Sequence, residues 1–379
     1  MRFDVELASS MEVKTINKTP LNNLHRELGG EMVEYAGWDM PVMFAGIVDE
    51  HMAVRERAGL FDASHMARIF LKGSGATDFL QRTLTNDITR LPDGMGHYTI
   101  ALNENGGIRD DLIVFKLGGE YMVIANAGNH AKIAAHFKTL LRGDVEMTDR
   151  SDELAMVALQ GPKSGEVAEK LSPGLSSLKR FYISDVSVGG VRMLVSRTGY
   201  TGEDGFEFYP DASRAEGLWR ALLEAGKSLP VASCGLGSRD GLRLEMAYSL
   251  YGHELDEQTN PMEANIGWAV KMDKGDFLGR AALEKIRAIG NTRNLIAFTC
   301  SGPGVPRMGY GLTINGVAAG TVTSGTYSPC LKTGIGLGFI KSGEDGNNLA
   351  VTVRGKSLPA VRIKPPFHKG GSVYGPGKP

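Results

Sequence analysis

Apolar positions between residues 67 and 142 change between the two-residue spacing of strands and the longer spacing of helices. Strand-like spacing covers 67–73, 97–103, 111–117 and 121–126, and helical spacing covers 75–84 and 129–142. An alternation of this kind favours a ferredoxin-like layer, in which a β-α-β-β-α-β order forms one sheet with helices on it.

A second mixed segment follows from Leu154. Its pattern changes from a strand to a helix near Pro162. Two further strands and a helix with an apolar stripe are expected at 186–197, 204–209 and 213–225. We expect this segment to form another α/β lobe, packed beside the first.

Beyond about residue 290 the pattern becomes a series of short β-runs with turns between them. Asn315-Gly316 lies between two alternating runs, and both residue types tolerate the positive φ of a two-residue hairpin turn. We therefore expect 295–370 to form an antiparallel β-barrel or sandwich, joined to the rest by a charged helical stretch over 277–293. The glycine-rich tail from Gly370 onward is expected to be loose.

Composition excludes several classes of function. The chain has 379 residues, 42% of them hydrophobic, and its 42 basic residues balance 43 acidic ones. No block of like charge could follow a phosphate backbone, so nucleic acid is not an expected partner. The apolar stretches are far shorter than the ~20 residues of a membrane helix, and the N-terminus shows no targeting pattern. We expect a soluble cytoplasmic protein without a membrane partner.

Metal-binding and disulfide patterns are not evident either. Cys234, Cys300 and Cys330 are far apart and odd in number, and they form no C-x-x-C pair. The eight histidines are scattered, with no cluster at metal-ligand spacing. The sequence therefore predicts neither a disulfide framework nor a metal site, in keeping with a reducing compartment.

Two glycine-rich segments are similar to nucleotide-binding loops. Gly235–Gly241 has three residues rather than two before its last glycine, and it follows the polar loop 227–233 instead of a clear strand. Gly199–Gly205 lacks the Gly-Lys-Ser/Thr ending of a phosphate loop. Neither segment supports a nucleotide site, and the first is expected to open a helix over 238–247.

Asp110 and Asp111 lie between the Gly106-Gly107 turn and an apolar β-run. Because side chains alternate along a strand, the two carboxylates are expected on opposite faces. A carboxylate that points inward needs a hydrogen bond or a counter-charge, since burial without a partner is unfavourable by several kcal/mol. By itself, the segment also fits a strand that simply begins with a polar pair.

A series of short segments extends along the chain from about residue 19 to residue 367. They are Thr19-Pro-Leu, Ala36-Gly-Trp-Asp-Met-Pro, Phe61-Asp-Ala-Ser-His-Met, Asn105–Val114, Leu159-Gln-Gly-Pro, Gly199–Glu207, Gly235–Glu245, Leu250-Tyr-Gly and Thr323-Ser-Gly. Each is weak alone, but so many in one order are hard to obtain by chance. Together they resemble the aminomethyltransferase family, the T-proteins of the glycine cleavage system.

The resemblance implies an α+β fold of three lobes in a ring-like arrangement, with tetrahydrofolate bound at the centre. It implies a first, folate-binding lobe formed by 1–50 and 150–235, and a ferredoxin-like second lobe formed by 51–149 and 236–285. The third lobe is a C-terminal antiparallel β-barrel over 290–379.

The resemblance also implies a reaction. The aminomethyl group on the lipoyl arm of a carrier protein, the H-protein, passes to tetrahydrofolate and yields methylene-tetrahydrofolate, ammonia and the reduced carrier. Asp111 corresponds to the aspartate beside the folate nitrogens, Glu207 to the glutamate that grips the pterin ring, and Arg239 to a folate contact. Met66 and Tyr98 match positions that line the same pocket.

The chemistry of these residue types fits the implied roles. A carboxylate such as Glu207 can accept two parallel hydrogen bonds from the amino group and ring N–H of a pterin. A negative charge at Asp111 stabilises an iminium-like carbon and orients the attacking nitrogen. No histidine relay is required. We expect His65 to be structural and Trp268 to lie in the core rather than to stack on a ligand.

Two other functions remain open on the sequence. The same architecture hosts folate-dependent demethylases, which take a methyl group from a small donor without a carrier protein. It also hosts non-catalytic folate-binding relatives that assist iron–sulfur cluster assembly, but their Lys-Gly-Cys-type segment is missing here. A binding protein without catalysis would tolerate the loss of Asp111.

Overall fold

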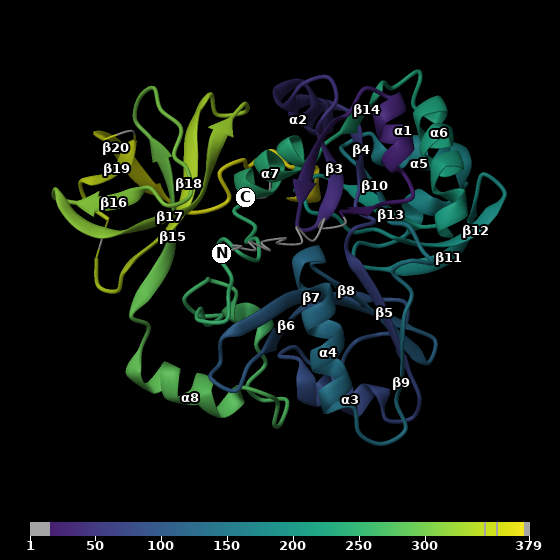
Figure 1. Cartoon of the computed structure of the whole chain (residues 1–379), viewed down its shortest axis with the longest axis horizontal. Helices are drawn as coiled ribbons and strands as arrows, with labels where there is room; N and C mark the ends of the chain where they lie inside the picture. Colours follow the sequence, from purple (N-terminus) through teal and green to yellow (C-terminus); the bar gives the residue numbers. More distant parts are fainter. Residues whose placement is uncertain (1–15, 345, 354, 375–379) are drawn as a thin grey trace, which may run out of the picture.

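The computed structural model describes residues 16–344, 346–353 and 355–374. Two mixed α/β lobes and a C-terminal β-barrel surround a central region, through which the chain runs after helix α7 (Leu236–Glu245) (Figure 1). The expected α+β class with three lobes is therefore confirmed. None of the helices in the described ranges has the length and apolar character needed to span a bilayer.

The first lobe is built on a six-stranded sheet whose strands come from distant parts of the chain. In spatial order they are β11 (Ile183–Val188), β12 (Val191–Ser196), β13 (Gly205–Tyr209), β10 (Val157–Gln160), β4 (Ala58–Asp62) and β14 (Val231–Cys234). Helices α5 (Ser164–Leu171) and α6 (Ala215–Ala225) cover it. Their buried side chains, among them Val167, Trp219 and Leu222, form one core with the strands.

A smaller sheet precedes this one in the chain. Its strands, in spatial order, are β1 (Asn17–Lys18), β3 (Trp38–Met43) and β2 (Glu31–Tyr35). Helix α1 (Asn22–Glu27) adds Leu24 to the core of the first lobe. Helix α2 (Ile47–Glu56) packs against β14, β4 and α7. The N-terminal segment therefore packs with the first lobe from residue 16 onward, and residues 1–15 of the expected span 1–50 lie outside the described residues.

Two details of this lobe differ from the expectation. Strand β4 lies within 51–149, the span expected for the second lobe, but it pairs with β10 and β14 in the first-lobe sheet. The single strand expected over 186–197 is a hairpin of β11 and β12. Gly189 and Gly190 form its turn with φ of 55° and 83°, values that glycine adopts without steric strain.

The second lobe contains a five-stranded sheet in the order β6-β7-β8-β5-β9. Its elements, in chain order, are β5 (Ala67–Lys72), α3 (Ala76–Thr83), β6 (Gly96–Leu102), β7 (Ile108–Leu117), β8 (Glu120–Ala125), α4 (His130–Leu140) and β9 (Glu146–Asp149). Apart from the edge strand β6, this is the β-α-β-β-α-β order of a ferredoxin-like fold, with antiparallel neighbours. The expected ferredoxin-like lobe is present.

The third lobe is a closed barrel. Its strands, around the barrel, are β15 (Arg293–Cys300), β18 (Thr333–Lys341), β17 (Val317–Ser328), β16 (Gly311–Ile314), β19 (Leu349–Val353) and β20 (Lys356–Ile363). Asn315 and Gly316 join β16 to β17 with φ of 52° and 79°, which confirms the expected hairpin turn. Helix α8 (Arg280–Ile289) provides the expected helical connection to the barrel.

The chain beyond the barrel returns to the first lobe. The backbone N–H and the hydroxyl of Ser372 both donate to Glu203, at 2.8 and 2.7 Å, and the N–H of His368 donates to the Glu245 carbonyl at 3.0 Å. The loose tail expected from Gly370 onward is therefore wrong as far as residue 374. Its remaining part, 375–379, lies outside the described residues.

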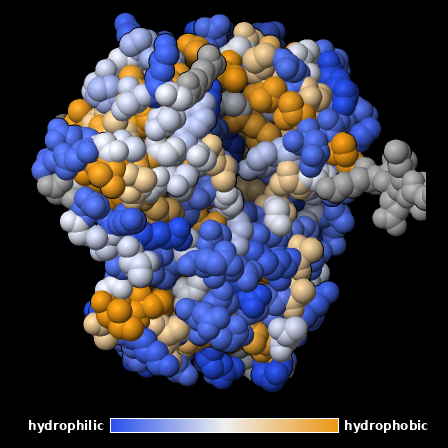
Figure 2. All heavy atoms as spheres, turned by 60° about the vertical axis from the view of Figure 1, so that its left-hand side comes forward, coloured by the Kyte–Doolittle hydropathy of each residue, from blue (hydrophilic) through white to orange (hydrophobic). Residues whose placement is uncertain are grey.

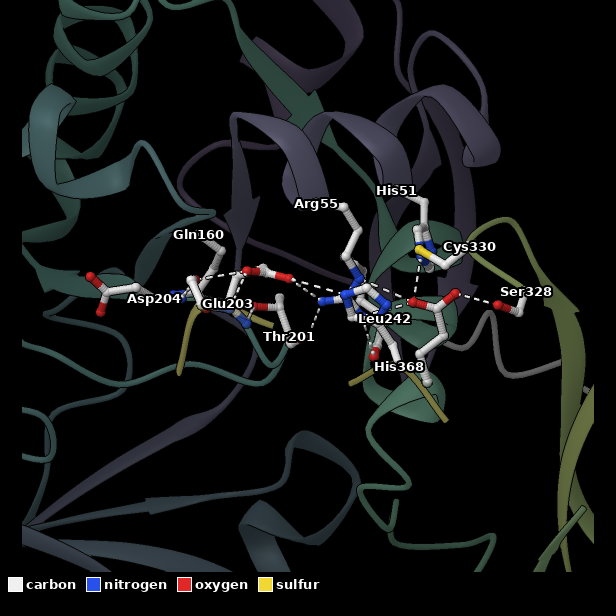
Figure 3. Close-up of polar contacts among 12 residues, drawn as sticks. His51, Arg55, Gln160, Thr201, Glu203, Asp204, Leu242, Ser328, Cys330 and His368 are labelled. Atoms are coloured by element: carbon white, nitrogen blue, oxygen red, sulfur yellow. Dashed lines mark hydrogen bonds and ion pairs between the residues drawn. The ribbon is translucent and has the colours of Figure 1, made fainter. Parts of the chain in front are cut away.

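Helix α7 connects the lobes. It packs on α2 and β3 of the first lobe and on β17 of the barrel, rather than inside the second lobe where it was expected. Its last residue, Glu245, is fully buried and accepts hydrogen bonds from His51 and Arg55, both at 2.9 Å, and from Ser328 at 2.5 Å (Figure 3). Arg55 also pairs with Glu203 at 2.7 Å. A buried polar network thus fixes the barrel against the first lobe.

Candidate active site

An inner cavity of about 330 Å³ lies where the two α/β lobes meet α7. All the residues that the family resemblance singled out line it, namely Asp111, Glu207, Arg239, Met66 and Tyr98. They come from β7, β13, α7, the β4–β5 turn and β6, in that order. The fold therefore brings residues from separate lobes to one hollow.

A wider, open chamber of about 1320 Å³ adjoins this cavity and shares Tyr98, Asp111 and Tyr200 with it. Residues of β15, β18 and β20 of the barrel line its other side. Figure 2 shows that the face on which the barrel comes forward is hollowed, with apolar side chains in the hollow. Asp111 lies at the junction of the inner cavity and the chamber.

Both carboxylate oxygens of Asp111 accept a hydrogen bond. Oδ1 accepts from the Asn126 amide at 2.8 Å, and Oδ2 accepts from the Tyr98 hydroxyl at 3.1 Å. Burial raises the pKa of Asp111 above its ordinary value, although these two hydrogen bonds oppose the shift. Each oxygen keeps lone-pair capacity for a further donor, so Asp111 can still accept hydrogen bonds from a ligand in the cavity.

Asp110 is fully buried and contacts the same asparagine. It accepts from the backbone N–H of Asn126 at 3.0 Å, from its amide at 2.8 Å, and from the Asn129 amide at 2.6 Å. Burial, and then the charge of Asp111, raise the pKa of Asp110. The two carboxylates, expected on opposite faces of the strand, therefore both accept hydrogen bonds from the side chain of Asn126. This residue directly follows β8.

Glu207 lies in the middle of β13 and is only 5% exposed. Its carboxylate accepts a hydrogen bond from the Thr198 hydroxyl. Burial raises the pKa of Glu207, while the Thr198 hydrogen bond and the charge of Arg239 oppose the rise. A buried carboxylate with unused acceptor capacity beside a cavity is suited to a ligand that brings N–H donors.

Arg239, in α7, contributes a positive charge to the cavity. Its guanidinium lies over the Tyr200 ring, 5.2 Å from the ring centre, and its Nη2 lies 4.0 Å from the Met66 sulfur. Within the described ranges, Arg239 forms no ion pair with a carboxylate, although its charge acts on the nearby Glu207. The charge is therefore available to an anionic or electron-rich ligand group.

Two aromatic residues near the cavity differ from the sequence interpretation. Trp268 is 61% exposed and stacks on Tyr98 with ring centres 5.3 Å apart, so the expectation that it is a core residue is wrong. Tyr200, which the interpretation missed, stacks on Tyr248 at 5.7 Å. Its place in the Gly199-Tyr-Thr-Gly segment was the available signal. His65 also lines the cavity, and burial lowers its pKa to about 4.

The glycine-rich segments serve close packing. A Cβ on Gly199 would lie 1.8 Å from the side-chain oxygen of Gln160, and one on Gly235 would lie 2.3 Å from the carbonyl carbon of Val42. A strand, β14, does precede Gly235, contrary to the expected polar loop, because it pairs in parallel with the distant β4. Glycine is thus required at these two positions by the neighbouring side chain and backbone.

One group of metal-ligand residue types occurs among the described residues. His51, Glu245 and Cys330 have ligand atoms within 4.8 Å of one another. Both Glu245 oxygens, however, already accept hydrogen bonds, and Arg55 places a positive charge on one of them. A metal ion at this position would have to displace the Arg55 guanidinium. We therefore assign these residues to the polar network between the first lobe and the barrel.

Comparisons with known proteins agree with this geometry. The family model described as the GCVT N-terminal domain matches residues 21–274, and the glycine cleavage T-protein C-terminal barrel domain matches 293–369. The chain belongs to the glycine cleavage T-protein family. The two matched regions together include both α/β lobes and the barrel of this T-protein family member.

Relatives that are named aminomethyltransferases align with nearly the whole of this chain. The aminomethyltransferase of Halothermothrix orenii is 43% identical over 356 residues, which is 93% of this chain and 100% of that protein. The aminomethyltransferase of Chloroherpeton thalassium is 46% identical over 359 residues, or 93% and 99%. The activity of the family member described here is that of an aminomethyltransferase of the glycine cleavage system.

A solved structure shows the same arrangement of lobes. The crystal structure of glycine cleavage system aminomethyltransferase T from Bartonella henselae superposes with a TM-score of 0.88 at 31% identity. The match covers 94% of this chain and 99% of the other. The T-protein fold therefore extends over both α/β lobes and the barrel.

Proposed function

We propose that the chain transfers the methylene carbon of an aminomethyl group from the lipoyl arm of H-protein to tetrahydrofolate, with release of ammonia. In this transfer the S–CH₂ and CH₂–NH₂ bonds break, and two C–N bonds form to the two folate nitrogens. The two N–H protons of the folate end on the thiol and on ammonia, so atoms and charge balance without an oxidant or a metal.

One observation carries this proposal: Asp111 and Glu207, from different lobes, line a single cavity. Its volume of about 330 Å³ is at the lower end of the range for small-molecule sites. That size suits a pterin ring, while the adjoining chamber leaves room for the rest of the folate and for the carrier's arm. The first and second lobes would then hold the folate between them.

Each residue has a proposed role. Glu207 accepts the amino and ring N–H groups of the pterin and so orients it, with Met66 and Tyr98 as walls of the pocket. Arg239 contributes a cationic folate contact. Asp111 lies where the carbon is handed over, and its charge stabilises the iminium-like carbon while it accepts a hydrogen bond from the attacking nitrogen.

The proposal is tested by supplying the purified protein with aminomethylated, lipoylated carrier and tetrahydrofolate. We expect formation of methylene-tetrahydrofolate and ammonia in equal amounts, dependent on all components. Parallel reactions replace the carrier with small sulfonium or aryl-ether methyl donors. Turnover with those donors alone would identify a demethylase, and folate binding without any turnover would identify a binding protein.

Replacing Glu207 with Gln is expected to weaken folate binding more than catalysis. The amide cannot accept two hydrogen bonds in parallel, and each charge-assisted bond contributes about 1.5–3 kcal/mol. We therefore expect the KM for tetrahydrofolate to rise about 10- to 100-fold, with a smaller change in kcat. Steady-state kinetics with varied folate measure this effect. The exposed Glu216→Gln, on α6, is the matched control, and equal KM values in the two variants would contradict the role.

The transfer rate is expected to fall at mildly acidic pH. The pKa of Asp111 is raised by burial, so its charge is lost at a pH above the ordinary aspartate value of about 4. Protonation removes the charge that stabilises the reacting carbon, and kcat decreases as the pH falls through this raised pKa. A pH profile with non-enzymatic rates subtracted measures the midpoint. A midpoint at or below the ordinary aspartate value would argue against a catalytic charge at this position.

A further inference from the structure

Asn126 is the shared partner of both aspartates in β7. It has two amide hydrogens, and its Nδ2 lies 2.8 Å from Asp111 Oδ1 and 2.8 Å from Asp110 Oδ1. It also lies 3.2 Å from the Asp111 carbonyl oxygen. One amide therefore bridges the carboxylate that faces the cavity and the carboxylate that lies behind it.

Asp110 fixes Asn126 at two points. Its Oδ2 accepts the backbone N–H of Asn126 at 3.0 Å, and its Oδ1 accepts the side-chain amide. Asn129, at the end of η1 (Ala127–Asn129), donates to Asp110 at 2.6 Å. Because Asp110 is fully buried, this arrangement cannot exchange its partners with water. The amide of Asn126 is thereby held with its nitrogen toward Asp111.

We propose that Asn126, anchored by Asp110, is a positioning residue that holds the Asp111 carboxylate in its reactive orientation and in its charged form. Asn126 and the Tyr98 hydroxyl each occupy one oxygen of Asp111. The rotation of the carboxylate is then fixed, and the remaining lone pairs face the cavity. This inference rests on the catalytic role proposed for Asp111.

The role of Asn126 follows from what surrounds Asp111. Titratable and charged groups from several elements interact with Asp111 or with Asp110. They are Tyr98 of β6, Tyr200 before β13, Glu254 after α7, Lys132 of α4 and Tyr251. Burial, and to a smaller extent the negative charge of Glu254, favour the neutral form of Asp111. The hydrogen bonds from Tyr98 and Asn126 favour the anion. Removal of Asn126 therefore shifts the balance toward protonation.

The test compares Asn126→Ala and Asn126→Asp with the wild-type enzyme. Loss of a hydrogen bond to a charged group is expected to lower kcat about 10- to 100-fold, with the KM for tetrahydrofolate little changed because Glu207 is intact. The acidic limb of the kcat profile is expected to move to higher pH. Asn126→Asp keeps the size of the side chain but places an oxygen against two carboxylates, so it is expected to be at least as defective.

Asn129→Ala is the matched control. Asn129 contacts Asp110 but not Asp111, so its removal takes away one hydrogen bond from the same cluster. Asp110 retains both contacts with Asn126, so kcat and the pH profile are expected to change much less than in Asn126→Ala. Thermal unfolding of all variants gives their stability independently of activity.

A second measurement does not depend on turnover. The carboxyl of Asp111 is titrated by ¹³C NMR in the free protein, where Asn126→Ala is expected to raise its midpoint and Asn129→Ala to shift it much less. A wild-type enzyme that fails to transfer the carbon would refute the proposed function. An active wild type whose Asn126 variants keep kcat and the titration midpoint would overturn the present inference, as would equal losses in the Asn126 and Asn129 variants.

Discussion

Replacing Asp111 with Asn is expected to lower kcat for methylene transfer by about 10²–10³, the effect of losing one preorganised charge at a reacting centre. The substitution preserves the size of the side chain, so the cavity keeps its shape. Folate binding is expected to persist, because Glu207 and Arg239, which line the same cavity, are unchanged. Single-turnover formation of methylene-tetrahydrofolate, combined with folate titration, separates the two effects.

The control for Asp111→Asn is Asp185→Asn. Asp185 lies on β11 in an exposed pair with Arg192, and it lines neither the inner cavity nor the chamber. It is expected to retain the wild-type kcat. A rate in Asp111→Asn close to that of this control would show that the carboxylate has no part in the chemistry, and it would favour a folate-binding protein.

Replacing Glu245 with Ala is expected to destabilise the fold by about 3–5 kcal/mol, the usual effect of removing one partner from a buried ion pair. Glu245 is fully buried, and its loss removes a shared acceptor from Arg55, His51 and Ser328, so that Arg55 keeps Glu203 as its carboxylate partner (Figure 3). Because those donors lie in both the first lobe and the barrel, we expect the two lobes to lose their mutual support. Urea unfolding followed by circular dichroism measures the change.

Glu146→Ala is the comparison for this loss. Glu146 pairs with Lys72 on the second lobe, and both side chains are more than half exposed, at 61% and 56%. An exposed pair of this kind contributes no more than about 1 kcal/mol. Similar stabilities for the two variants would indicate that Glu245 contributes no more than a surface charge.

The parts of the fold that follow from local spacing could be predicted from the sequence. The ferredoxin-like lobe and the barrel hairpin at Asn315-Gly316 depend on contacts between neighbouring elements, so periodicity and turn chemistry suffice. Strand β14 was missed because its four residues show no alternation and it is held by parallel pairing with the distant β4. The turn at Gly189-Gly190 was missed because the apolar pattern continues across it.

The candidate active-site residues were predicted from short segments matched to a family, and their convergence on one cavity needed the structure. Asp111 and Glu207 lie on strands of different sheets, and nothing in their local sequence places them in one cavity. Trp268 was assigned to the core because large aromatic residues are usually buried, whereas it stacks on Tyr98 at the chamber wall. Asn126 carries no local signal, since its partners lie on the adjacent strand.

The pairing of β4 with β10 and β14 has a consequence for synthesis on the ribosome. The five-stranded sheet of the second lobe and its two helices are contiguous in the chain, over residues 67–149, so they can pair as soon as that stretch emerges. Strand β4 is made before that stretch, but its two neighbours are made after it. At ordinary elongation rates β4 waits on the order of ten seconds for its partners. During that time both edges of β4 lack their partners, so the sheet of the first lobe can be completed only after the sheet of the second lobe has been made.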